Sequence, residues 1–117
     1  MEQKSREMAR LAFEALDDKK GEDIRIIDIS RISTISDYFL VVHGNSVSQT
    51  KALEESVREK LGKSGFSPEQ VEGNGTGTWI LMDYSDVIVH IFDKDSRRFY
   101  DLEHIWSDGR DVLPECL

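Results

Sequence analysis

The segment 78–92, "TWILMDYSDVIVHIF", determines what kind of sheet this chain builds. Residues 78–83 and 86–92 are rich in β-branched, aliphatic and aromatic side chains, which favour strands. The pair Tyr84 and Ser85 separates them and leaves room for only a tight turn. The sequence therefore predicts an antiparallel hairpin in this part of the chain.

A two-residue turn determines which hairpin residues face each other. The expected pairs are Asp83 with Asp86, Met82 with Val87, Leu81 with Ile88, Ile80 with Val89, and Trp79 with His90. Because side chains alternate between the faces of a strand, one face collects only Ile80, Met82, Val87 and Val89. We call this the aliphatic face and expect it to lie in the core. Tyr-Ser lacks the Asn-Gly chemistry that a type I′ turn prefers, and a longer turn would shift the pairing.

The other side of the hairpin, which we call the mixed face, collects Trp79, Leu81, Asp83, Asp86, Ile88 and His90. Directly opposed carboxylates destabilise a strand pair, so this composition suits a core poorly. It suits a protein-binding surface, which uses an aromatic anchor, apolar neighbours and a charged rim. In the alternative interpretation a helix covers this face and His90 is a buried, hydrogen-bonded residue. The pattern alone leaves both interpretations open.

The segments around the hairpin complete one α/β domain. Helices are expected at 3–20, from Ser46 onwards and at 93–106, and strands at 23–30, at 38–43 and around Val71. Ser46 and Gln49 match a capping box, and the last helix should carry Phe99, Leu102, Ile105 and Trp106 on one face. A strand–helix–strand unit beside a hairpin predicts a mixed sheet flanked by helices. We expect the domain to span 1–108 and 109–117 to form a loose tail.

Composition narrows the class of partner. The 117 residues carry a net charge of −8, which repels phosphate backbones and attracts a basic protein. In the alternative interpretation the charge only keeps the protein soluble.

The single cysteine, Cys116, excludes an internal disulfide and suits a reducing cytosol. The charged start of the chain shows no secretory signal, and the longest apolar run, "YFLVV", is far too short to span a membrane. We therefore expect a cytoplasmic protein, or one from the stroma or matrix of an organelle with its transit peptide removed, and little direct nucleic-acid contact.

The best enzyme candidate is a nucleotidyl transfer site. "HGNS" (43–46) is similar to the glycine-serine turn of nucleotidyltransferases, and Asp93 and Asp95 of "DKD" are suitable ligands for Mg²⁺. Against this, the region after the second helix has no D-x-D pair, and Asp93 is also a suitable N-cap. The three histidines lack metal-ligand spacing, and "GNGTG" lacks the lysine of a P-loop. We expect no catalysis, no cofactor and no metal.

Two long runs resemble the ribosomal silencing factor S family, also called Iojap proteins. They are "DISRISTISDYFLVVHGNSVSQTKAL" and "WILMDYSDVIVHIFDKDSRRFYDLEHIWSD", and the resemblance extends from the first helix to about Asp108. The motifs S-x-x-x-D-Y-F, G-x-S-x-x-Q, W-I-L-x-D-Y, D-V-x-V-H-x-F and R-x-F-Y-x-L-E-x-x-W carry it. One departure is Ser85, where the family usually has glycine, so a positive φ at this residue would cost some strain.

The resemblance implies a nucleotidyltransferase-like α/β fold without catalytic acids. It also implies binding to large-subunit ribosomal protein fourteen, where the small subunit docks, so that subunit joining is blocked and translation repressed when nutrients are scarce. The family's W-I-L-x-D-Y-x-D-V-x-V-H motif falls on the hairpin. The expected partner contacts are therefore Trp79, Leu81, Asp83, Tyr84, Asp86, Ile88, His90 and, as a further acidic residue, Glu103. A weak homodimer that dissociates to bind the ribosome is compatible with this interpretation.

Overall fold

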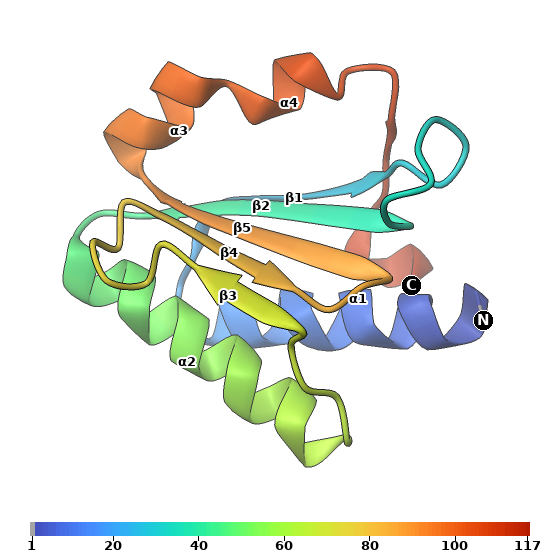
Figure 1. Cartoon of the computed structure of the whole chain (residues 1–117), viewed down its shortest axis with the longest axis horizontal. Helices are drawn as coiled ribbons and strands as arrows, with labels where there is room; N and C mark the ends of the chain where they lie inside the picture. The colour runs from blue at the N-terminus through green and yellow to red at the C-terminus, as the bar shows by residue number, and fades with distance from the viewer. Residues whose placement is uncertain (1) are drawn as a thin grey trace.

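The computed structural model describes residues 2–117 as a sheet with helices on both of its faces (Figure 1). The six strands run in the order β3-β4-β5-β2-β1-β6; α1 and α2 cover one face, and α3 and α4 lie over the other. The elements are α1 (Glu2–Asp18), β1 (Glu22–Asp28), β2 (Tyr38–Gly44), α2 (Val47–Lys63), β3 (Gln70–Glu72), β4 (Trp79–Asp83), β5 (Val87–Asp93), α3 (Lys94–Tyr100), α4 (Leu102–Ile105), β6 (Arg110–Asp111) and the 3₁₀ turn η1 (Pro114–Cys116). No helix among these residues combines the length and apolar character needed to cross a membrane.

The centre of the sheet is the parallel pair β2–β5. Tyr38 pairs with Val87 at one end and Gly44 with Asp93 at the other, while the remaining strand pairs among residues 2–117 are antiparallel. Nearly all side chains of these two strands are buried, as expected for a strand that is apolar on both faces. The predicted single α/β (α+β) domain with a mixed sheet flanked by helices is confirmed.

Helix α2 begins and ends as its sequence predicts. The Ser46 hydroxyl accepts a hydrogen bond from Gln49 N at 3.1 Å, and Gln49 Oε1 accepts one from Asn45 N at 2.7 Å, one residue before the position usual in a capping box. At the other end Gly65 has a φ of +88°, and the amide of the next residue, Phe66, reaches back to Leu61 O at 2.9 Å. This Schellman arrangement requires a positive φ after the cap, which glycine adopts without strain.

The β4–β5 hairpin forms as predicted, but its register is displaced by two residues. The observed pairs are Trp79 with Phe92, Ile80 with Ile91, Leu81 with His90, Met82 with Val89, and Asp83 with Ile88. The turn lies one residue further along the chain than expected: Tyr84 N donates to Val87 O at 2.9 Å around Ser85 and Asp86, and Ser85 has a φ of 74°. Asp83 Oδ1 accepts from Ser85 N at 2.8 Å and stabilises this turn. A two-residue shift keeps every side chain on its predicted face, but the expected opposition of Asp83 and Asp86 is wrong.

The predicted helix over 93–106 is two short helices, α3 and α4, with a break at Asp101. This residue has a φ of 47°, a left-handed conformation that aspartate tolerates better than most residues. The break places Leu102 in the core, whereas Phe99 and Ile105 are 80% and 69% exposed. The prediction that these residues share one helical face with Trp106 is therefore wrong.

The C-terminal segment is not a loose tail. Arg110 and Asp111 form β6, which pairs with Asp28 and Ile27 of β1 at the edge of the sheet. Val112 N continues the contact by donating to Ile26 O at 2.9 Å. The segment after Asp108 is thus held by backbone hydrogen bonds that residue types alone do not reveal.

The sheet separates two hydrophobic clusters. The larger cluster joins α1 and α2 to the sheet and contains the whole aliphatic face, Ile80, Met82, Val87 and Val89, each fully buried. The smaller cluster lies under α3 and α4 and consists of Ile27, Ile29, Phe39, Val41, Ile88, Phe92 and Leu102, with Trp79, Leu81 and Trp106 packed at its margin. The mixed face therefore belongs partly to a second core and partly to the surface.

Candidate protein-binding site

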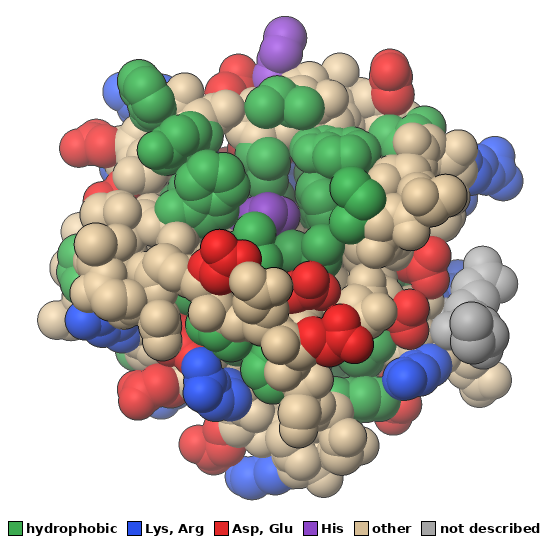
Figure 2. All heavy atoms as spheres, viewed as in Figure 1, with side chains coloured by type: hydrophobic (Ala, Val, Ile, Leu, Met, Phe, Trp, Pro, Cys, Tyr) green, Lys and Arg blue, Asp and Glu red, His purple; other side chains and the backbone are tan. Residues whose placement is uncertain are grey.

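The mixed face opens on the side of the sheet that α3 and α4 only partly cover. Figure 2 shows hydrophobic side chains gathered between these helices and the sheet, with a histidine in the hollow among them and acidic side chains along the lower margin. Among the predicted contacts, Trp79, Leu81, Asp83 and Asp86 are partly exposed, while Ile88 and His90 are buried. The first four can meet a partner directly, and the last two support them from beneath.

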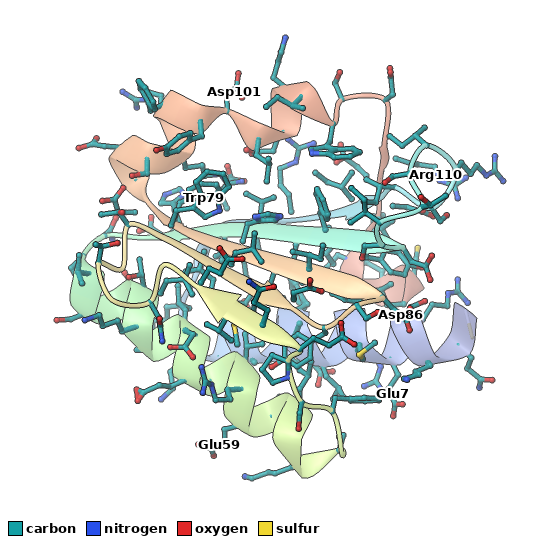
Figure 3. All side chains as sticks on the ribbon, in the orientation of Figure 1. Glu7, Glu59, Trp79, Asp86, Asp101 and Arg110 are labelled. Carbon is teal, nitrogen blue, oxygen red and sulfur yellow. The ribbon has the colours of Figure 1, made fainter. Side chains whose placement is uncertain are left out.

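Trp79 is held in one orientation by its neighbours. Its ring packs against Phe92, with centroids 5.0 Å apart, and against Tyr100 of α3 at 4.6 Å. The indole Nε1 donates to His90 Nδ1 at 3.2 Å. In Figure 3 the labelled Trp79 lies between the sheet and α3. The indole thus contacts a helix of its own chain and still keeps part of its surface exposed. This arrangement is intermediate between the two alternatives left open by the sequence, an uncovered binding face and a face covered by a helix.

His90 is buried and neutral. It is 4% exposed, and because its Nδ1 accepts the indole hydrogen bond, its proton resides on Nε2. Burial lowers the pKa of His90 to about 4. The alternative that made His90 a buried, hydrogen-bonded residue is correct for this side chain, whose role is to orient Trp79.

The burial of His90 predicts acid sensitivity of the fold. The unfolded chain takes up a proton near pH 6.5, whereas folded His90 resists it down to about pH 4. The free energy of unfolding is therefore at its full value above pH 6.5 and falls as the pH drops towards 4. Between pH 7 and pH 5 we expect a loss of about 2 kcal/mol from this residue.

Urea unfolding at the two pH values, in wild type and in His90→Gln, measures this loss. Glutamine retains an acceptor for the indole and does not titrate. The pKa of His43 is also lowered, by burial and by the charge of Arg97, so only the difference between the two proteins isolates His90. An equal fall in both proteins would show that His90 is not the group responsible.

The acidic margin of the mixed face has no cations of its own. None of the ion pairs formed within residues 2–117 includes Asp83 or Asp86. In Figure 2 some basic side chains lie near the edge of the hydrophobic patch and below its acidic border, but none lies between the patch and that border. The negative charge beside the apolar surface is therefore available to a basic partner.

Two predicted contacts lie elsewhere. Tyr84 is buried in the larger cluster on the α1–α2 side, and burial raises the pKa of its hydroxyl to about 12. It follows the alternation of Ile80 and Met82, so it points away from the mixed face. Glu103 Oε2 accepts from Arg97 Nε at 3.2 Å and from its terminal nitrogen at 2.8 Å. In this structure Tyr84 therefore lies in the core and not on the mixed face, and Glu103 forms an internal ion pair with Arg97.

Sequence reasoning missed Tyr100, whose ring covers one side of Trp79 and contacts Phe99 at a centroid distance of 5.1 Å. Consecutive residues cannot share a helical face, and the sequence prediction chose Phe99 of the "FY" pair as the buried residue. In the structure Tyr100 is the residue that packs against Trp79. Phe99 and Tyr100 extend the apolar surface from the sheet onto α3.

The sequence of the whole domain matches one family model. The model describes "Ribosomal silencing factor during starvation" and covers residues 2–116. The chain belongs to the ribosomal silencing factor family. The resemblance seen in the sequence motifs is thereby confirmed.

Relatives of this chain occur in bacteria and plants. The chain is 41% identical to "Ribosomal silencing factor RsfS" of Bacillus subtilis over 109 residues, covering 93% of this chain and 91% of the relative. It is 29% identical to "Protein Iojap, chloroplastic" of Zea mays over 93 residues, or 80% of this chain and 40% of the maize protein. A crystal structure from Chromobacterium violaceum has a TM-score of 0.85 at 38% identity, covering 92% of this chain and 88% of that chain. A crystal structure from Bacillus halodurans has a TM-score of 0.82 at 36% sequence identity, covering 92% of this chain and 97% of that chain.

The segments proposed for nucleotidyl transfer do meet in this chain, but their polar side chains cap helices. Gly44 and Asp93 pair at the ends of the parallel strands. Asp93 Oδ1 accepts from Ser96 N at 2.8 Å, and the Ser46 hydroxyl caps α2. Within residues 2–117 no three His, Cys, Asp or Glu side chains converge to hold a metal. The relatives are named as silencing factors rather than enzymes, which favours a non-enzymatic regulator.

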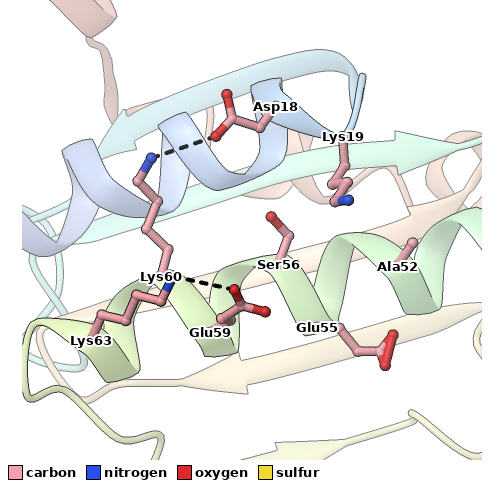
Figure 4. A pocket seen from close by; sticks show the side chains of 8 residues that line it. All are labelled: Asp18, Lys19, Ala52, Glu55, Ser56, Glu59, Lys60 and Lys63. Carbon is pink, nitrogen blue, oxygen red and sulfur yellow. Dashed lines mark hydrogen bonds and ion pairs between the residues drawn. The ribbon is translucent and has the colours of Figure 1, made fainter.

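A groove between α1 and α2 also carries charged side chains (Figure 4). It measures about 550 Å³, and four of its charged side chains form ion pairs: Lys60 lies 3.5 Å from Asp18, and Lys63 lies 3.4 Å from Glu59. Such solvent-exposed pairs are ordinary surface electrostatics. The mixed face is thus the better candidate for a functional surface.

Proposed function

We propose that this protein silences translation by binding large-subunit ribosomal protein fourteen through the mixed face and blocking the joining of the small subunit. The observation that carries the proposal is an apolar, tryptophan-centred surface in a member of the ribosomal silencing factor family. This surface is bordered by the carboxylates of Asp83 and Asp86, which form no ion pair within residues 2–117. Under this proposal the protein acts in the cytoplasm, chiefly during the starvation named in the family description.

The mechanism is occlusion without chemistry. Trp79 and Leu81 contribute the apolar contact, and Asp83 and Asp86 attract Lys and Arg side chains of the partner. Charge complementarity raises the association rate, whereas burial of the indole sets how long the complex lasts. Because His90, Phe92 and Tyr100 already fix the indole, little side-chain entropy is lost on binding. The bound protein then occupies the surface that the small subunit needs.

Two measurements test this proposal. The wild-type protein should co-sediment with isolated large subunits, and binding should weaken as salt is raised. When purified subunits are mixed, the protein should lower the amount of joined ribosomes in a sucrose gradient, in proportion to occupancy of the large subunit. Joining that proceeds normally on saturated large subunits would contradict occlusion, and a protein that stays in the supernatant would contradict binding itself.

Asp83→Lys should slow association with the large subunit by about tenfold at low salt, with a smaller change in dissociation rate. The substitution places a positive charge where the partner is expected to be positive. Stopped-flow binding at two salt concentrations measures the effect, which should shrink at high salt.

Asp83→Asn and Glu7→Lys are the matched controls for this variant. Asparagine removes the charge and keeps an acceptor for Ser85 N, so it separates the charge effect from damage to the turn. Glu7 lies on α1, on the opposite side of the sheet in Figure 3, and its reversal should have little effect. Equal slowing by Asp83→Lys and Glu7→Lys would show that net charge, and not the mixed face, governs association.

A further inference from the structure

We infer that the hollow beside Trp79 receives one long cationic side chain of the partner, lysine or arginine, and that Glu72 is its counter-charge. The hollow measures about 260 Å³ and is lined by Glu72, Gly73, Trp79 and Leu81. The inference rests on the proposed function, because it assigns a specificity residue to the same surface. Glu72 lies on β3 at the sheet edge, outside the hairpin on which the family motif falls.

Strand pairing brings Glu72 to the apolar surface. It is directly opposite Leu81 across β3–β4, so the two side chains are neighbours on the side of the sheet that also carries Trp79. Gln70 Nε2 donates to Glu72 Oε2 at 2.7 Å and orients the carboxylate. In the described part of the chain no Lys, Arg or His forms an ion pair with Glu72.

The backbone keeps this hollow unfilled. Gly73 has a φ of +79°, and a Cβ added there would lie 1.9 Å from the carbonyl oxygen of Trp79. The loop after β3 must therefore pass close to β4 without a side chain at this point. The indole and Leu81 remain as apolar walls, with one carboxylate at the rim.

This combination selects one kind of side chain. A lysine or arginine can lay its aliphatic stem along Leu81 and the indole, gain a cation–π contact, and pair its charge with Glu72. An acidic side chain would be repelled, and a purely apolar one would desolvate the carboxylate without compensation. The net charge of −8 favours the same choice.

Glu72→Gln tests the inference by removing the charge while retaining shape and hydrogen-bonding capacity. In co-sedimentation with isolated large subunits across a salt series, we expect about tenfold weaker binding and a shallower salt dependence. Glu7→Gln on α1 makes the same charge change away from the hollow and should bind within about twofold of wild type. Both variants should unfold at the wild-type temperature, since both glutamates are exposed.

Repeating Glu72→Gln in a protein that already carries Leu81→Ala tests whether one partner side chain contacts both residues. If one partner side chain contacts both Leu81 and Glu72, the effect of Glu72→Gln should fall below about threefold in Leu81→Ala, because the two substitutions remove the same contact. If the losses of binding caused by the two substitutions add fully, no single partner side chain contacts both Leu81 and Glu72. Wild-type affinity in Glu72→Gln, with binding lost in Trp79→Ala, would overturn the inference and leave the proposed function standing. Failure of the wild-type protein to co-sediment would overturn both.

Discussion

Trp79→Ala should weaken binding to isolated large subunits by about a hundredfold while the protein remains folded. The indole is the largest partly exposed apolar group of the mixed face, and its contacts with Phe92, Tyr100 and His90 present it in a single orientation. Tryptophans that are fixed before binding and buried afterwards supply much of the affinity of protein interfaces. Co-sedimentation at a fixed, physiological salt concentration measures the loss directly.

The same substitution has a structural cost that must be separated from the binding defect. Alanine removes packing against Phe92 and Tyr100, and we expect about 2 kcal/mol of destabilisation, below the range for a fully buried aromatic residue. Phe13→Ala is the matched control, because Phe13 is a half-buried aromatic residue that packs against the larger cluster on the opposite side of the sheet. It should destabilise the fold comparably and still bind. Equal binding losses in the two variants would trace the effect to stability, and wild-type affinity in Trp79→Ala would reject the mixed face.

Arg97→Ala should lower the free energy of unfolding by about 3 kcal/mol. Arg97 is only 7% exposed and donates to Glu103 at 2.8 Å and to Glu22 O at 3.2 Å. Its removal leaves the carboxylate of Glu103, itself largely buried, without its nearest cation. This pair also fixes α4 to α3 across the break at Asp101. Urea unfolding at neutral pH measures the change.

Two further variants define what Arg97 does. Arg98→Ala, next to it on the exposed side of α3, should stay within about 0.5 kcal/mol of wild type. Combining Arg97→Met with Glu103→Leu should recover part of the loss, because no unpaired charge remains buried. A free energy of unfolding within about 1 kcal/mol of wild type in Arg97→Ala would show that the pair is dispensable.

The sequence was most informative where a pattern repeats locally. Alternation along the hairpin correctly assigned Ile80, Met82, Val87 and Val89 to the core. The predicted register was wrong by two residues, and an even shift leaves each side chain on the same face. Capping chemistry located the start of α2 at Ser46. These signals depend on a few neighbouring residues and are therefore visible without coordinates.

The sequence was least informative where contacts outside the local pattern determine the structure. The break at Asp101 accompanies an ion pair between Arg97 and Glu103, and β6 exists only because β1 offers a free edge. Within the hairpin, Tyr84 points into the core because the turn is formed by Ser85 and Asp86, one residue further along the chain than predicted. Glu72 escaped notice because its place beside Leu81 follows from a three-residue edge strand. Each of these features requires knowledge of what lies across the sheet.

The position of Cys116 has a practical consequence for single-site labelling. It is the one cysteine in the sequence, its side chain is exposed, and its carbonyl oxygen accepts from Arg6 of α1 at 3.4 Å. The C-terminus lies on the α1 side of the sheet, on the opposite side from α3 and α4 (Figure 1). A maleimide dye or a biotin linker attached there would report on or immobilise the molecule with its mixed face unobstructed. The native chain can therefore be labelled for stopped-flow or surface capture without introducing or removing any residue.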